Sequence, residues 1–401
     1  MTENLEVDLV DENGGMNQII KDVCLQVFDF KNPNEITIEM EKKYELLNDL
    51  CLTLVIEDNG TINKYCPAYY CDVLEIIDTN LSEDLPPPKL EPELINFGPG
   101  FNKIVDDVDP RMYHLKPVYD LLSQLTRHLI EVGQDYSDVI FDFCFIEKLF
   151  NRLRSRDEEE RNMVRLLLME IYTNNKTCRS NIFKLIMQEI ITAIGQKSNV
   201  FFHIDNLIDL LYFIIENHEA NELENSDSIY RILVSLHRLP YLYYYYEVLF
   251  SCCVSFLEKF PNKVQTFTFF ILHTIGDKTE SPTNRIMFTI EIIHILNLLK
   301  KLYDQSSNED KNELLKIVDK LMPAILKMFA INLQTLNTIL INYTLKQLSN
   351  EDFVPFYTRQ NKLIREIFLL IFEDESNFIQ WESTTFCRQI LTYMHLIQIP
   401  K

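Results

Sequence analysis

The stretch that decides the fold is Ser155–Ile186, which reads SRDEEERNMVRLLLMEIYTNNKTCRSNIFKLI. Asp157 followed by Glu160 fits an N-terminal capping pattern, and the acidic residues of DEEE suit the positive end of a helix dipole. Apolar residues then recur at the spacing of one helix face: Met163, Leu166, Leu167 and Ile171. This half of the stretch predicts an amphipathic helix.

A second helix follows a short polar break at Asn174 and Asn175. In it, isoleucines recur at every fourth position: Ile182, Ile186, Ile190 and Ile194. Two apolar stripes joined by a short hinge can bury each other, so the stretch predicts an α-hairpin. A different stripe runs along the first helix and should lie away from that core or at its margin: Arg165, Met169 and Tyr172.

Helix-length apolar stripes of this kind recur from residue 111 onward. We expect helices at 112–131, 137–153, 158–174, 179–195, 203–217, 228–239, 241–259, 263–275, 285–303, 309–328, 331–348, 353–373 and 380–397. Taken in pairs they repeat roughly every 40–47 residues, which is the period of HEAT and armadillo units. Such hairpins stack because none of them buries its apolar face alone. The expected fold is therefore all-α, a HEAT/armadillo-like solenoid of stacked helical hairpins.

Residues 1–110 differ in charge from the rest of the chain. They hold 24 of the 60 acidic residues and 7 of the 38 basic ones, a net charge of −17. Helical patterns near 16–29 and 39–53 make this region partly helical. We therefore divide the chain into an acidic N-terminal extension, 1–110, and a HEAT-like solenoid, 111–401.

Two segments of the N-terminal region carry turn signals. Thr53–Cys66 has an Asn-Gly pair between apolar runs, which indicates a small β-hairpin. Leu85–Phe101 holds five of the 15 prolines and two of the eight glycines. Since proline removes a backbone donor and blocks helix continuation, we expect a linker or an extended arm near 85–101.

Composition excludes several classes of function. Glycine makes up 8 of 401 residues, about 2% against a typical ~7%, which disfavours glycine-rich phosphate loops and doubly wound sheets. The net charge of −22, with no long basic run, disfavours nucleic acid and anionic membrane surfaces. The longest apolar stretch, Leu242–Leu257, contains Glu247 and is shorter than the about 20 residues of a membrane span.

Sites for chemistry are also missing from the sequence pattern. The nine cysteines form no Cys-x-x-Cys pair, and the eight histidines have no ligand spacing to one another or to the cysteines. We therefore expect no metal and no cofactor. Since no catalytic constellation stands out either, we expect no enzyme. The acidic start MTENLEVDLV is unlike a signal peptide, so the expected compartment is the cytoplasm or the nucleus.

Several segments together carry a resemblance to a known family: His114–Leu122, Phe145–Tyr172, Ile204–Ile215, Ile232–Lys259 and Ser281–Leu296. The most specific pieces are the Leu-His-basic triplet at Leu236–Arg238 and the Phe-Leu-Glu-Lys that ends at Lys259. Trp381 stands where the family has a tryptophan in its last repeat. In order and spacing, residues 111–401 resemble the regulatory B-prime subunits of protein phosphatase 2A, which are HEAT-like solenoids. Residues 1–110 show no comparable match.

The resemblance implies a non-catalytic subunit that joins a phosphatase scaffold subunit and a catalytic subunit and chooses the substrates. Part of that choice uses a groove in the middle repeats that takes short linear motifs of the form Leu-x-x-Ile-x-Glu. Carried over by position, the groove would contain Arg165, Tyr172, Arg179, Leu210 and Ile214. Arg179 could pair with a carboxylate, and Leu210 and Ile214, one helical turn apart, could receive an aliphatic side chain.

The chain departs from the family pattern within this groove. The family's His-Arg before Ile-Tyr is Met169-Glu170 here, and a later Lys and His fall near Glu222 and Asn225. Because like charges repel when desolvated, we expect the groove to prefer a less acidic motif. The alternative function is a transport or assembly adaptor of the armadillo or HEAT type, unrelated to phosphatases. The single tryptophan counts against it, since armadillo transport receptors usually repeat Trp-x-x-x-Asn elements.

Overall fold

The chain divides into two compact units, Met1–Ile214 and Ile215–Lys401, each of which is a stack of helical hairpins. The expected all-α solenoid fold is confirmed. The structure is a computed structural model. It describes residues 9–11, 15–28, 36–55, 65–82, 94–96, 102–104, 111–132, 141–195, 203–223, 225–239, 242–275, 282–333, 337–348 and 350–360.

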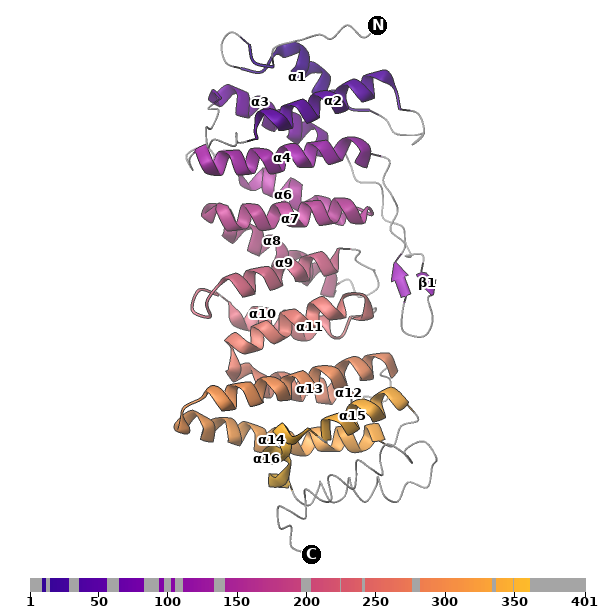
Figure 1. Cartoon of the computed structure of the whole chain (residues 1–401), viewed down its shortest axis with the longest axis vertical. Coiled ribbons are helices and arrows are strands. Elements are labelled where there is room, and N and C mark those ends of the chain that lie inside the picture. The colour runs from indigo at the N-terminus through magenta and orange to yellow at the C-terminus, as the bar shows by residue number, and fades with distance from the viewer. Residues whose placement is uncertain are drawn as a thin grey trace, which may run out of the picture. The chain divides into compact units, whose positions relative to one another are not determined.

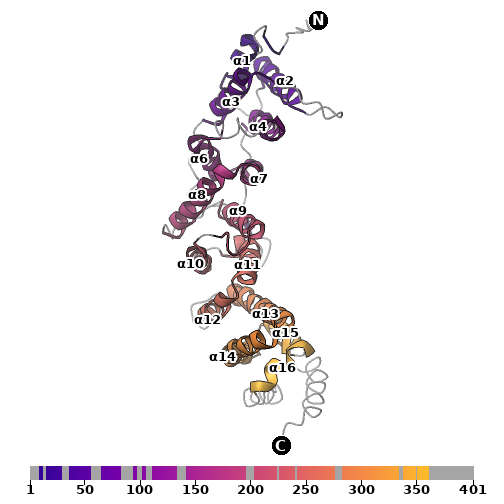
Figure 2. The same cartoon turned by 90° about the vertical axis from the view of Figure 1, so that its left-hand side faces the viewer.

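The first unit has two layers of helices. Its helices are α1 (Gln18–Cys24), α2 (Ile38–Thr53), α3 (Pro67–Leu81), α4 (Met112–Val132), α6 (Phe143–Asn151), α7 (Glu158–Asn174), α8 (Lys176–Gly195) and most of α9 (Ile204–Asn217), with a 3-10 turn η2 (Arg152–Arg154). Figure 2 shows α4 and α7 in one layer and α6 and α8 in the other, in agreement with the contacts within each pair.

The helices before residue 111 pack on the helices after it. Both α2 and α3 contact α4, and α3 also contacts α6 (Figure 1). An ion pair joins Lys148 Nζ of α6 to Asp78 of α3 at 2.7 Å. In the part of the chain that the structure describes, α1–α3 therefore belong to the stack of the first unit, and the division between compact units falls after Ile214.

The second unit repeats the two-layer arrangement. It contains α10 (Ser226–Leu236), α11 (Leu242–Lys259), α12 (Val264–Ile275), α13 (Pro282–Gln305), α14 (Asn308–Leu333), α15 (Thr338–Leu348) and α16 (Val354–Tyr357), with 3-10 turns η3 (Pro261–Lys263), η4 (Glu351–Phe353) and η5 (Thr358–Gln360). Here α11, α13 and α15 make up one layer, and α12 packs on α14 in the other. The expected helix at 380–397 and Trp381 lie outside the described residues. No described helix combines the length and apolar composition needed to cross a bilayer.

Two short strands interrupt the helices. β1 (Leu94–Asn96) pairs antiparallel with β2 (Asn102–Ile104), and Leu94 lies opposite Ile104. They fall in and just after the proline-rich segment that the sequence marks as non-helical. The Asn-Gly hairpin expected within Thr53–Cys66 has its turn outside the described residues.

Ion pairs between successive helices of one layer mark the repeat. In the first unit, Arg127 Nε of α4 lies 2.9 Å from Glu170 Oε1 of α7, 43 residues further on. In the second unit, Lys301 Nζ of α13 lies 2.9 Å from Glu258 Oε1 of α11, again 43 residues away. This spacing agrees with the sequence period of roughly 40–47 residues.

The hairpin of α7 and α8 shows how the sequence sets this geometry. Asp157 Oδ1 accepts hydrogen bonds from the Glu159 and Glu160 amides at 2.8 and 3.2 Å, which confirms the expected cap. The buried face of α7 is Val164, Leu167, Leu168 and Ile171. Leu166, which the sequence placed in the core, is 56% exposed. On α8, Ile182, Ile186 and Ile190 are fully buried as expected.

Candidate peptide-binding surface

The five residues expected in the groove lie on three consecutive helices of the first unit. Arg165 and Tyr172 are on α7, Arg179 is in the first turn of α8, and Leu210 and Ile214 are on α9. These helices come from adjacent hairpins of the stack, so side chains from two repeats meet here. We call this set the α7–α9 surface.

Arg179 is held against the end of α7. Its Nε donates to the carbonyl oxygen of Tyr172 at 2.8 Å, and its Nη2 donates to that of Thr173 at 2.8 Å. These carbonyls belong to the last turn of α7, where no helical amide is available to them. Among the acidic residues that the structure describes, none forms an ion pair with Arg179. Its positive charge is therefore not neutralised by a carboxylate of the described chain.

Tyr172 connects Arg179 to α9. Its ring lies 5.5 Å from Arg179 Cζ and meets the Phe213 ring edge-on at a centroid distance of 6.2 Å. A cation over an aromatic face is stabilised by the ring quadrupole. Burial raises the pKa of Tyr172, and the Arg179 charge offsets part of that rise. The phenol therefore stays neutral, and Tyr172 serves as a packed platform for the guanidinium.

Arg165 already has a partner within the protein. Its Nη1 forms an ion pair and a hydrogen bond with Asp209 Oδ2 of α9, and both side chains are partly exposed. The sequence analysis missed Asp209. The repeat offered a signal for it, because the two residues are 44 residues apart, close to one period. Because Asp209 already offsets its charge, Arg165 attracts a ligand carboxylate less strongly than Arg179 does.

Leu210 and Ile214 are enclosed by the protein. Their side chains are 2% and 3% exposed. The two residues lie one helical turn apart on α9, and Phe213 lies between them in the sequence. They belong to the buried apolar core around α9. An aliphatic side chain of a ligand could reach them only after neighbouring side chains move.

Glu170 is not directed toward α9. Its carboxylate accepts hydrogen bonds from Arg127 Nε at 2.9 Å and from Ser123 Oγ at 3.3 Å, and both partners are on α4. The repulsion that the sequence suggested is therefore weakened, because Glu170 is paired on the side of α7 that faces the preceding repeat. Glu222 lies after α9, where its carboxylate accepts a hydrogen bond from the Glu219 amide at 3.0 Å.

Comparison with known proteins identifies a family that matches most of the chain. The family model "Protein phosphatase 2A regulatory B subunit (B56 family)" matches residues 11–297. The match includes α1–α3, where the sequence pattern alone carried no resemblance to the family, and ends within α13.

Individual relatives are similar at low identity. The chain is 27% identical over 283 residues to the 56 kDa regulatory subunit delta isoform of Saccharomyces cerevisiae, covering 70% of this chain and 36% of that protein. It is 26% identical over 294 residues to the B' kappa isoform of Oryza sativa, covering 69% and 52%. It is 24% identical over 284 residues to the alpha isoform of Mus musculus, covering 69% and 54%.

The matched region thus spans about half the length of these relatives or less. Within this chain, however, the family match covers nearly all of the first unit, extends into the second unit as far as α13, and includes every residue of the α7–α9 surface. The chain belongs to the B56 family of protein phosphatase 2A regulatory B subunits.

Proposed function

We propose that this chain is a non-catalytic regulatory subunit of protein phosphatase 2A. In this role it docks on the scaffold and catalytic subunits and selects phosphoprotein substrates in signalling. Family membership supports the proposal, since the relatives described above are named as regulatory subunits of this phosphatase. The role requires no cofactor and places the chain with its phosphatase in the cytoplasm, the nucleus or both.

The α7–α9 surface is the proposed docking site for short linear motifs of substrates. The observation that carries this assignment is Arg179, a cation fixed by two backbone carbonyls and an aromatic ring with no acidic partner among the described residues. A guanidinium has five N–H donors, of which two are used by these carbonyls. The remaining N–H groups on the two terminal nitrogens can bind both oxygens of a peptide carboxylate.

The mechanism that follows is tethering. A motif bound at the α7–α9 surface keeps the rest of the substrate near the catalytic subunit. A short flexible tether raises the effective concentration of the phosphorylated site to roughly the millimolar range. The chain would thus change which substrates are dephosphorylated without making or breaking a bond itself.

The armadillo or HEAT-type adaptor that the sequence left open is not favoured. Its fold class is the same, so the stack of hairpins does not separate the two functions. The family match favours the phosphatase role, because the matching family is one of phosphatase regulatory subunits.

Affinity purification of the full chain from its own cells, with identification of the co-purifying chains, tests the proposed function. We expect the phosphatase scaffold and catalytic subunits in near-equal amounts. Recovery of cargo proteins and small GTPases, with no phosphatase subunit, would support the adaptor and reject the proposal. Addition of a phosphatase assay to the purified material gives a second readout, because a bound catalytic subunit brings activity that the chain alone lacks.

A further inference from the structure

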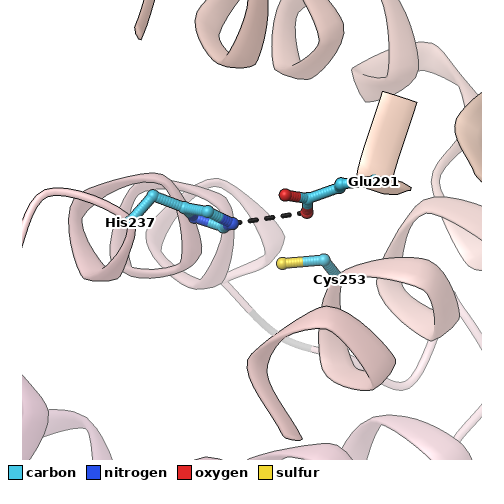
Figure 3. A group of neighbouring side chains, drawn as sticks. All are labelled: His237, Cys253 and Glu291. Atoms are coloured by element: carbon cyan, nitrogen blue, oxygen red, sulfur yellow. Dashed lines mark hydrogen bonds and ion pairs between the residues drawn. The ribbon is translucent and has the colours of Figure 1, made fainter. Parts of the chain in front are cut away.

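Three buried side chains that can bind a metal meet in the second unit. His237 follows the last residue of α10, Cys253 is on α11 and Glu291 is on α13, and the three residues are 3%, 1% and 1% exposed. One ligand atom from each lies within 4.8 Å of the other two (Figure 3). The sequence hid this cluster, since it joins three helices and His237 is 54 residues from Glu291.

The hydrogen bonds of His237 fix which nitrogen faces the cluster. Nδ1 lies 2.7 Å from the carbonyl oxygen of Leu233. A carbonyl only accepts, so Nδ1 carries a proton and donates it, and Nε2 of the neutral imidazole presents a lone pair. Histidines that bind metals usually have this arrangement, with the second ring nitrogen donating to a carbonyl or a carboxylate.

Glu291 is incompletely satisfied. Its Oε1 lies 3.3 Å from His237 Nε2, and its Oε2 is buried with no hydrogen-bond partner in the structure. A buried carboxylate oxygen without a partner is costly. Two acceptors that face each other across 3.3 Å need a positive charge between them, either a proton or a cation.

The distance favours a cation. Hydrogen bonds between a charged imidazole and a carboxylate are about 2.7–2.9 Å long, shorter than the observed 3.3 Å. In a tetrahedral zinc site with bonds of about 2.0–2.1 Å, a nitrogen and an oxygen ligand lie about 3.3–3.4 Å apart. The sulfur of Cys253 points toward the gap between His237 and Glu291 (Figure 3). A shift on the order of 1 Å would bring it to bonding distance of a shared ion.

The charges also balance. A divalent cation with one thiolate, one carboxylate and one neutral imidazole carries no net charge, so its burial avoids the penalty of an uncompensated ion. The rings of Phe267 and Phe288 lie beside the cluster, 5.6 and 6.0 Å from the His237 ring. A mixed nitrogen, sulfur and oxygen ligand set suits zinc better than magnesium or calcium, which prefer oxygen.

We propose that His237 Nε2, Cys253 Sγ and a carboxylate oxygen of Glu291 bind one zinc ion that ties α10, α11 and α13 together. On binding, the thiol of Cys253 gives its proton to solvent and the sulfur bonds to the metal. The three residues leave the fourth position of a tetrahedral shell to another ligand. The site is structural and is independent of the phosphatase role.

The test uses the full chain produced in medium with limited zinc and added Co²⁺, so that metal enters as the enclosed site folds. Wild type should show the near-ultraviolet absorption of a cobalt–thiolate bond. In zinc-replete medium, elemental analysis after dialysis should give about one zinc per chain, as expected of a structural site. The zinc should remain bound near neutral pH. The zinc-loaded protein should melt at a higher temperature than zinc-depleted protein.

Variants then assign the ligands. Cys253→Ser and Glu291→Gln should lower bound zinc at least tenfold, and Cys253→Ser should abolish the cobalt–thiolate band. Cys252→Ser is the matched control, because Cys252 is equally buried on the same helix and lies outside the cluster; it should retain the metal. The proposal is overturned if the wild-type protein holds no zinc and shows no cobalt–thiolate band. This result does not depend on whether the variants fold. A cobalt–thiolate band that persists in Cys253→Ser also overturns the proposal.

Discussion

The guanidinium of Arg179 lies over the ring of Tyr172, with Cζ 5.5 Å from the ring centroid, while its Nε donates to the Tyr172 carbonyl at 2.8 Å. One residue thus holds the cation by both its backbone and its side chain. This double contact joins the end of α7 to the start of α8 and orients the free N–H groups of Arg179. Pre-orientation of this kind lowers the entropic cost of binding a ligand carboxylate.

Arg179→Ala should weaken binding of a Leu-x-x-Ile-x-Glu peptide by about tenfold or more, because a charged hydrogen-bonded pair is lost. Fluorescence anisotropy with a labelled peptide measures the change. Lys184→Ala is the matched control, since Lys184 is an exposed cation on α8, the same helix that carries Arg179. Equal peptide affinity in wild type and Arg179→Ala, with unchanged circular dichroism, would remove Arg179 from the site.

Asp209→Asn should strengthen binding of the same acidic peptide. Asp209 neutralises Arg165, so its removal frees a second cation on α7, the helix that carries Tyr172. We expect a gain of about threefold to tenfold in affinity, equivalent to about 0.7–1.4 kcal/mol. The double variant Arg165→Ala/Asp209→Asn should lose this gain. If the single variant binds no more tightly than wild type, Arg165 does not contribute to the peptide site.

The sequence predicted the fold better than it predicted the packing of α7. The cap at Asp157 and the break at Asn175 set the ends of this helix, and both signals are local, so its bounds came out correctly as 158–174. The buried face of this helix was predicted less well. The apolar run from Met163 to Met169 supports two registers one residue apart, and packing against α4 and α8 buries Leu168 and exposes Leu166.

The candidate sites depended on contacts between repeats. The resemblance in sequence located Arg165 and Arg179. It did not show whether their charges are neutralised, because the residues that decide this lie a repeat away or on another helix. Asp209, which the sequence did not reveal, pairs with the expected groove residue Arg165. Glu170, which the sequence placed in the groove, instead pairs with Arg127 of the preceding repeat. The cluster that contains His237 and Glu291 was not predicted for the same reason, because its residues come from different helices.

Glu160→Ala should destabilise the protein by about 3–5 kcal/mol, because it leaves Arg152 buried without its counter-charge. In the native protein Glu160 Oε1 accepts from Arg152 Nε at 2.8 Å and from Tyr119 Oη at 2.6 Å, and the Glu160 side chain is fully buried. Urea unfolding followed by circular dichroism measures the shift in midpoint. Glu159→Ala, which removes an exposed ion pair with Lys116, should cost less than about 1 kcal/mol. Similar losses for both variants would contradict this reading of Glu160.

Acid stability should depend on Glu189. Burial by itself raises the pKa of Glu189, but hydrogen bonds from His203 Nε2 at 3.0 Å and from Arg154 at 2.7 and 2.9 Å outweigh it and lower the pKa to about 2. A carboxyl group whose pKa falls on folding stabilises the native state above its unfolded pKa, and this stabilisation is lost as the pH drops toward the folded pKa. The contribution is up to about 3 kcal/mol and disappears between about pH 4.5 and pH 2.

Glu189→Gln keeps an acceptor oxygen for His203 but cannot take up this proton. Its free energy of unfolding should be lower than that of wild type at pH 7 and should fall less steeply between pH 4.5 and pH 2. Urea unfolding at a series of pH values gives both curves. Glu147→Gln, at an exposed position of α6, should keep the wild-type slope. Parallel curves for wild type and Glu189→Gln across that window would mean that the ion pair with Arg154 does not determine the acid sensitivity of the first unit.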